Sequence, residues 1–181
     1  MKALGMVEFN SIATGVLAGD RMLKCANVKL MSAQPVCPGK YIVMVEGQVQ
    51  AVKSAVEAGE MGAKEELVDS LVIASLHDQV FEAIACTTQI TGESAIGIIE
   101  CFSLVTSIYC ADAAVKSANI DLIEIRLGRG LGGKSYVVLA GDVSSVKHAV
   151  DVANEKFGQE GMLVRTVVIP SPHKDILESL M

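Results

Sequence analysis

The sequence predicts an α/β protein built from two tandem copies of one small sandwich domain. The first observation behind this prediction is an internal repeat, since the segment LGMVE at residues 4–8 returns as IGIIE at residues 96–100. The offset between matching residues is 92 at first and grows to 94 and then 96 through two small slips. The second observation is composition, because 51% hydrophobic residues suffice for a core. A register that persists over nearly the whole chain indicates duplication rather than chance.

The strands of the first copy are predicted from short apolar runs bounded by polar or turn-forming residues. We expect strands over residues 3–8, 28–32, 41–45 and 67–73. Gly5 lies inside the first run, which suggests a close approach of another element to this strand. Residues 35–40 contain two prolines and a glycine, and this segment is therefore predicted as a turn or loop rather than a regular element.

The helices are predicted from helical spacing and from capping residues. We expect them over residues 12–26, 49–61 and 77–84. In the first helix, five residues recur near helical spacing: Ile12, Gly15, Val16, Gly19 and Leu23. Ser11 is a plausible N-cap for this helix, and Asp142 has the same role before a helix over residues 143–157. The second copy repeats the order strand, helix, strand, strand, helix, strand and short closing helix.

The repeat also gives the expected domain boundaries. The first domain spans residues 1–86, a threonine-containing linker spans 87–93, and the second domain spans 94–181. Acidic residues exceed basic residues by three in each half, so neither half is a charged appendage. Each copy is an α/β sandwich of roughly 85 residues, a size at which a domain has its own core.

Composition excludes several classes of partner. The chain has no Trp, only 4% aromatic residues and a net charge of −6, so we expect no binding to nucleic acid. The apolar stretch at the N-terminus is too short for a signal peptide, and no segment reaches the ~18 apolar residues of a membrane span. We therefore expect a cytoplasmic protein with no membrane contact. Its five cysteines are then expected to be largely free thiols.

Several segments resemble the shell domain of bacterial microcompartments. In the first half they are residues 4–8, 20–28 and 38–41, and in the second half 95–100, 111–119, 141–143 and 168–173. The resemblance covers essentially the whole chain and implies two ferredoxin-like α/β sandwich domains in tandem. It further implies a homotrimer that mimics the hexamers of single-domain shell proteins. Such a tile would lie in the microcompartment shell with other shell proteins as partners, and would not be an enzyme.

The loop PVCPGK at residues 35–40 resembles one particular class of these shell proteins. It is similar to the loop of the iron-sulfur shell proteins of propanediol-utilisation compartments. That resemblance implies one [4Fe-4S] cluster per trimer, bound at the threefold axis by Cys37 of three chains. It also implies electron transfer or cluster delivery across the shell, with an encapsulated redox enzyme as a further partner.

The residues alone leave the role of Cys37 open. A cluster needs three or four thiolates, yet the sequence has no CxxC spacing, and the other four cysteines lie in helices, at a strand end or in the linker. Three copies about one axis would supply three thiolates and leave one iron to another ligand. Pro35 and Pro38 would stiffen the loop, and Gly39 would let its backbone pass close to the cluster. A free thiol in a surface turn is the simpler interpretation without the resemblance.

The equivalent loop of the second copy, residues 127–134, contains no cysteine. Together the two loops give a predicted pore loop: Val36, Pro38, Gly39, Gly128, Arg129 and Gly130. Residues 128–135 also match the phosphate-binding pattern GxxxxGKS. We interpret this match as coincidence, because the pattern requires a helix after it and residues 136–139 are predicted as a strand.

Other residues recur at equivalent positions. Lys24 and Lys116 each lie in the last turn of a predicted helix, where a cation stabilises the helix dipole. The resemblance implies that both lysines contact neighbouring tiles, and that His77 and His173 lie at the tile edge. A lone histidine is more often structural. The repeated Glu8 and Glu100 at strand ends indicate a structural role, and no catalytic set emerges.

Three hypotheses follow. The first is a shell trimer with a [4Fe-4S] cluster at its axis. The second is a metal-free tile whose pore passes a small polar metabolite. The third, of another class, is a pair of ferredoxin-like domains that binds a small regulatory ligand or substrate and forms no sheets.

Overall fold

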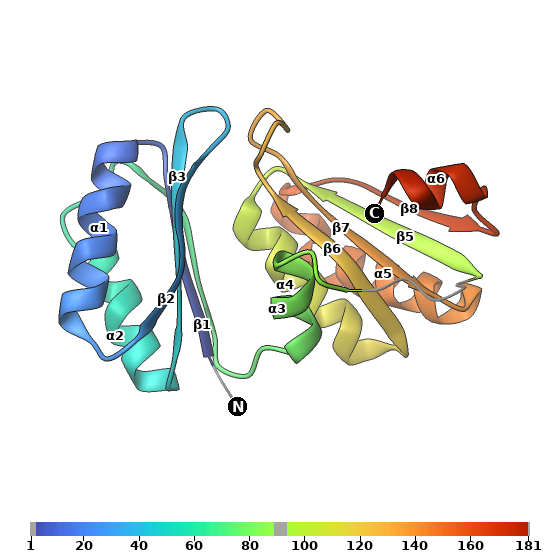
Figure 1. Cartoon of the computed structure of the whole chain (residues 1–181), viewed down its shortest axis with the longest axis horizontal. Helices are drawn as coiled ribbons and strands as arrows, with labels where there is room; N and C mark the ends of the chain where they lie inside the picture. Colours follow the sequence, from blue (N-terminus) through green and yellow to red (C-terminus); the bar gives the residue numbers. More distant parts are fainter. Residues whose placement is uncertain (1–2, 89–93, 181) are drawn as a thin grey trace. The chain divides into compact units, whose positions relative to one another are not determined.

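The computed structural model describes residues 3–88 and 94–180 of the chain (Figure 1). Its contacts divide the chain into two compact units. The first contains Met1–Leu76 and Gly128–Gly133, and the second contains His77–Leu127 and Lys134–Met181. Residues 77–86 were predicted as the end of the first domain, and their contacts group them with the second unit. The predicted domain limits remain a prediction, and most of the predicted linker, residues 89–93, lies outside the described residues.

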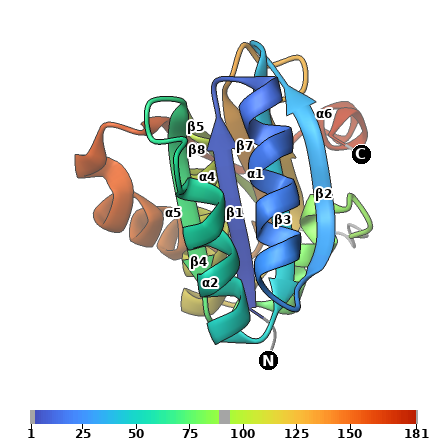
Figure 2. The ribbon, with the colours of Figure 1, turned by 90° about the vertical axis from the view of Figure 1, so that its left-hand side faces the viewer.

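The first unit is a four-stranded antiparallel sheet with two helices on one face. Its strands are β1 (Ala3–Phe9), β2 (Lys29–Val36), β3 (Lys40–Gly47) and β4 (Leu67–Ile73), in the spatial order β2-β3-β1-β4. Figure 2 shows helices α1 (Ile12–Cys25) and α2 (Val49–Glu60) side by side over this sheet. The core lies between the two helices and the sheet, and it includes Val7, Phe9, Met22, Val43 and Ala55.

The second unit repeats this plan. Its strands are β5 (Ala95–Cys101), β6 (Ile120–Leu127), β7 (Ser135–Gly141) and β8 (Leu163–Pro170), in the order β6-β7-β5-β8. Its long helices are α4 (Leu104–Ser117) and α5 (Val143–Phe157), followed by the 3-10 turn η1 (Gly158–Glu160). The short helices α3 (Asp78–Ile84) and α6 (Lys174–Ser179) end the two repeats. The α/β class and the predicted order of elements are therefore confirmed.

Two details of the first repeat differ from expectation. Strand β2 extends to Val36, and Pro35 pairs opposite Tyr41, so the predicted loop shrinks to a turn at residues 37–39. An edge strand accepts a proline because the missing N–H would otherwise face outward. The buried residues of α1 are Gly15, Ala18, Gly19 and Met22, whereas Ile12, Val16 and Leu23 are exposed. Small residues face the sheet because a Cβ on Gly15 would lie 2.6 Å from Tyr41.

The predicted helix caps are confirmed. The hydroxyl of Ser11 accepts a hydrogen bond from the backbone N–H of Thr14 at 3.3 Å. The carboxylate of Asp142 accepts one from the N–H of Ser145 at 2.9 Å, and hydrogen bonds from Ser144 and Ser145 lower the pKa of Asp142 well below its usual range. Among the described residues, no helix is long and apolar enough to span a membrane.

The close approach predicted at Gly5 has an expected effect on stability. A Cβ at this position would lie 2.7 Å from Cγ1 of Val52 and 2.8 Å from Cγ2 of Val56, both on α2. We expect Gly5→Ala to lower the free energy of unfolding by about 1–3 kcal/mol through overpacking, as measured by urea denaturation. Gly158→Ala is the control, because Gly158 has helical φ and ψ of −64° and −30° and an added Cβ would be 4.0 Å from its nearest neighbour. Equal stability of the two variants would contradict the tight helix–sheet contact.

Candidate functional site

The candidate site lies at the tip of the β2–β3 hairpin. Cys37 follows the buried Val36 at the end of β2, and its side chain is half-buried. The turn closes through a hydrogen bond from the N–H of Gly39 to the carbonyl of Val36 at 3.1 Å. The N–H of Cys37 donates to the carbonyl of Gly128 at 2.9 Å. The backbone of Cys37 is therefore held from two sides, by its own hairpin and by residues 128–133.

A cavity of about 320 Å³ opens beside this cysteine. Its lining residues are Pro35, Val36, Cys37, Gly39, Arg129 and Gly130. Four of the six residues predicted for the pore loop therefore line the same cavity as Cys37. Gly128 joins them through its carbonyl, and a Cβ on Gly133 would lie 2.8 Å from Cδ of Pro38. The structure thus brings the predicted loop residues together within the first unit.

The glycines of residues 128–133 have a structural explanation. Gly128, Gly130, Gly132 and Gly133 all have positive φ, between 60° and 89°. That backbone favours glycine, and at Gly133 the close contact with Pro38 also leaves no room for a side chain. Ser135 begins β7 rather than a helix, and its buried hydroxyl donates to the carbonyl of Ser103 at 2.8 Å. The GxxxxGKS match is therefore not a phosphate loop.

Arg129 gives the cavity its charge. Its guanidinium donates a hydrogen bond to the side-chain oxygen of Gln34, which fixes the cation on the exposed side of the hairpin. The residues that line the cavity include this one cation and no carboxylate. The lining of the cavity therefore carries a net positive charge.

The other cysteines lie elsewhere in the fold. Cys25 and Cys86 are exposed, Cys101 and Cys110 are buried, and all five cysteines are free thiols. Among the described residues, no three His, Cys, Asp or Glu side chains gather in a way that could hold a metal ion. A single chain therefore presents one cysteine at the hairpin tip, and a multi-thiolate site would need further copies of the chain.

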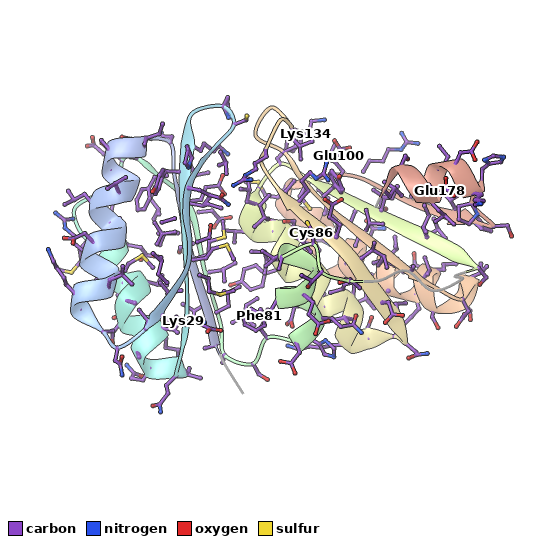
Figure 3. The ribbon with its side chains drawn as sticks, in the orientation of Figure 1. Lys29, Phe81, Cys86, Glu100, Lys134 and Glu178 are labelled. Carbon is purple, nitrogen blue, oxygen red and sulfur yellow. The ribbon has the colours of Figure 1, made fainter. Side chains whose placement is uncertain are left out.

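The repeated glutamates form ion pairs that the sequence analysis did not predict. Lys40 lies 2.7 Å from Glu8, whose side chain is fully buried, and Lys134 lies 2.7 Å from Glu100 (Figure 3). The signal was present in the sequence, since a Gly-Lys pair follows Glu8 by 31–32 residues and its repeat equivalent follows Glu100 by 33–34 residues. Both pairs link the first strand of a repeat to its neighbouring hairpin, which agrees with the expected structural role.

A family model for the BMC domain matches this chain twice, at residues 3–76 and 95–172. The chain belongs to the BMC domain family. The bacterial microcompartment shell protein PduT of Citrobacter freundii is 43% identical over 180 residues, which cover 99% of this chain and 98% of PduT. The crystal structure of a microcompartment protein from Desulfitobacterium hafniense matches with a TM-score of 0.91 and 48% identity, over 98% of this chain and 99% of that chain.

Single-domain relatives match one BMC domain at a time. The shell protein PduA of Citrobacter freundii is 38% identical over 85 residues, which cover 46% of this chain and 88% of PduA. Two BMC domains thus follow each other in this chain, as the internal repeat predicted. The chain is a structural shell protein of the tandem-domain type.

The residues predicted at the tile edge have local partners in both repeats. Lys24 pairs with Asp20 at 2.7 Å, and Lys116 pairs with Asp112 at 2.6 Å, one helical turn away in each case. His77 and His173 are the N-caps of α3 and α6, where Nδ1 accepts a hydrogen bond from the backbone N–H two residues later. The structural role expected for the histidines is thus found, and the contacts with neighbouring tiles remain a prediction.

A polar cluster around the buried Glu124, in the second unit, escaped the sequence analysis. Glu124 accepts hydrogen bonds from Arg126 at 2.7 Å and from the hydroxyl of Tyr136 at 3.0 Å, and the thiol of Cys86 lies 3.9 Å away. Burial and the bond to Glu124 raise the pKa of Tyr136, and the same carboxylate raises the pKa of Arg126. The pair of Glu124 and Arg126 is neutral overall, so the cluster is a closed network rather than a ligand site.

Proposed function

We propose that this chain forms a three-chain tile of a microcompartment shell and that Cys37 of the three chains binds one [4Fe-4S] cluster. The cluster would transfer electrons, or be delivered, between the two sides of the shell. The observation that carries this proposal is the half-buried thiol of Cys37 at the tip of a fixed hairpin, beside a small cavity that Arg129 also lines.

The cysteines of this hairpin can bind such a cluster only when several chains assemble. A cubane is held by three or four thiolates, and each chain offers one cysteine at this hairpin. Three chains would supply three thiolates and leave one iron to an external ligand. If both loops of each chain carried a cysteine, three chains would bring six thiolates together, twice the number required. In this chain the second loop, residues 128–133, is rich in glycine and has no cysteine.

The surroundings of Cys37 support the same assignment. A Cβ on Gly39, Gly130 or Gly132 would meet no atom within 4 Å, so the backbone of both loops borders open space. Arg129 supplies a positive charge that would offset the negative charge of thiolates and cluster. The bound cluster would supply one-electron transfer, and the chain's own residues would position the thiolates and balance their charge.

Metal analysis of anaerobically purified protein tests this proposal. We expect brown protein with roughly four iron and four sulfide per three chains, and a paramagnetic signal in one redox state. Colourless protein without stoichiometric iron would contradict the cluster. That result would favour the second candidate, a metal-free tile that passes small polar metabolites, which the open glycine loops also support.

Assembly with other shell proteins follows from the same proposal. Lys24 and Lys116 lie on exposed or half-exposed helix ends and are the proposed contacts with neighbouring tiles. His77 and His173 would then stabilise helices near those edges through their N-caps.

A further inference from the structure

Equivalent strands of the two repeats differ sharply in exposure. In β6, Leu122 and Ile125 are buried, whereas in β2 the equivalent Leu30 is 41% exposed and Ala33 is exposed. Each strand lies at the edge of its sheet, β2 next to β3 and β6 next to the equivalent strand β7. The difference therefore comes from what lies against each strand rather than from its place in the repeat.

Helix α3 lies against β6 within the second unit and provides the template for this contact. The side-chain amide of Gln79 donates to Asp121 at 3.1 Å, and its oxygen accepts the backbone N–H of Leu122 at 2.9 Å. The N–H of His77 donates to Asp112 on α4 at 3.0 Å. Val80 and Ala83, on the same helix, are fully buried.

Helix α6 is the equivalent of α3, but its matching face is exposed. His173 aligns with His77 at an offset of 96, which places Asp175, Ile176 and Ser179 where α3 has Gln79, Val80 and Ala83. Ile176 is 50% exposed, and Asp175 and Ser179 are also exposed. Leu177 and Leu180, on the other side of the helix, pack against the core of the second unit. One face of α6 is thus anchored and the other is uncovered.

Helix α1 shows the same contrast with its equivalent. Ile12 and Val16 are 46% and 53% exposed, whereas their equivalents in α4, Leu104 and Ile108, are fully buried. The first repeat therefore has an uncovered surface made of α1 and β2. We call this surface, represented by Ile12, Val16, Asp20, Lys29 and Leu30, the receiving surface.

The charges of α6 and of the receiving surface are complementary. Asp175 on α6 is the repeat equivalent of Gln79, and Lys29 on β2 is the repeat equivalent of Asp121. Where α3 and β6 form the Gln79–Asp121 hydrogen bond, α6 and β2 therefore offer a carboxylate and an ammonium group. The ammonium of Lys29 lies 3.1 Å from Glu46, and its side chain remains 77% exposed. A cavity of about 290 Å³ opens beside it, lined by Asn27, Val28, Lys29, Glu46, Gly47 and Gln48. Asp20 occupies the position of Asp112, the acceptor for the helix N-terminus.

We propose that α6 of one chain docks on the receiving surface of a second copy, as α3 docks on β6 within one chain. Asp175 pairs with Lys29 of the next copy, and Ile176 covers its Leu30. The contact is head-to-tail, so it forms a closed ring when the rotation between copies allows closure. It deepens the proposed three-chain tile, on which it rests, by naming the surfaces that join the chains.

Zero-length cross-linking of the unmodified protein tests the pairing directly. A carbodiimide joins a carboxylate to an amine only when the two are in contact, so we expect a product that links the peptides containing Asp175 and Lys29, distinct from the link between Lys29 and Glu46 of one chain. The reaction is carried out on a ring reassembled from equal amounts of ¹⁴N and ¹⁵N chains. About half of this product should be isotopically mixed, because each link joins two chains. Absence of the product, or a product without mixed isotopes, would overturn the proposal.

A charge reversal on α6 gives an independent test. Asp175→Lys should abolish the three-chain species in native mass spectrometry at concentrations where the wild type is fully assembled, because two cations then face each other. Glu178→Lys is the matched control, since Glu178 is exposed on the same helix (Figure 3) and its equivalent on α3, Glu82, is exposed rather than packed on β6. Far-UV circular dichroism checks that both variants fold. Assembly of Asp175→Lys at wild-type level would overturn the proposal.

The outcomes separate this inference from the proposed function. Wild-type protein that forms three-chain rings with iron but lacks the Asp175–Lys29 link would refute only the docking of α6. Wild-type protein that stays monomeric would refute the tile as well. Rings with the link but without iron would support the docking and refute the cluster.

Discussion

Replacing Cys37 with serine is expected to remove iron, sulfide and brown colour completely. In the proposed tile one substitution removes every protein ligand, because each of the three thiolates comes from the same position. A serine hydroxyl stays protonated at neutral pH and is a poor ligand for iron in a cluster. Assembly should be unaffected, since the bond from this residue to Gly128 is made by its backbone N–H. Iron and sulfide analysis and native mass spectrometry together measure both properties.

Cys25→Ser is the control for this substitution. Cys25 is also a free thiol, but it lies at the end of α1, where its thiol donates to the carbonyl of Ser54 at 3.7 Å. We expect the full iron content in this variant. Colour that survives Cys37→Ser would place the cluster elsewhere, and colour lost in Cys25→Ser would point to a different ligand set.

Lys40→Met is expected to be the most destabilising single substitution among those considered. It removes the cation 2.7 Å from Glu8, whose side chain is fully buried. Breaking a buried ion pair by removing one partner costs roughly 3–5 kcal/mol, because the remaining charge stays in a poorly solvated position. Urea denaturation should show a large fall in the free energy of unfolding.

The second repeat offers a matched control. Lys134→Met breaks the equivalent pair at the same 2.7 Å distance, but the side chain of Glu100 is 34% exposed and that of Lys134 is 43% exposed. Water can solvate the remaining carboxylate there, so we expect a loss of only about 0–1 kcal/mol. Similar losses in the two variants would mean that burial does not determine the strength of this repeated pair.

The repeat made most of the fold predictable. Because two copies of one pattern had to fold alike, weak local signals at one position were supported by equivalent signals in the other copy. The order of the strands, Ser11 as a cap and the close approach at Gly5 all follow from such patterns, whereas the end of β2 at Val36 did not. The exposed apolar face of α1 was not predictable, because spacing alone does not distinguish a face that packs on the sheet from one left free for another surface.

The sequence was enough to predict which residues form the candidate site, but not how they are arranged in space. The turn residues around Cys37 identify a rigid loop, yet nothing local indicates that Gly128 and Arg129 lie beside it. The hydrogen bonds of Gln79 were missed for a similar reason, since its partners come from a strand far along the chain. Tertiary contacts of this kind have no short-range signature in sequence.

The contact between α3 and β6 affects how the protein responds to dilution. Both elements belong to one chain, so their effective concentration is fixed by the connecting segment and is of the order of millimolar or higher. The proposed contact between α6 and β2 has no such tether and follows the law of mass action. In the proposed ring, the contact between α3 and β6 would therefore not depend on protein concentration, and only the contacts between chains could be lost when few chains are present.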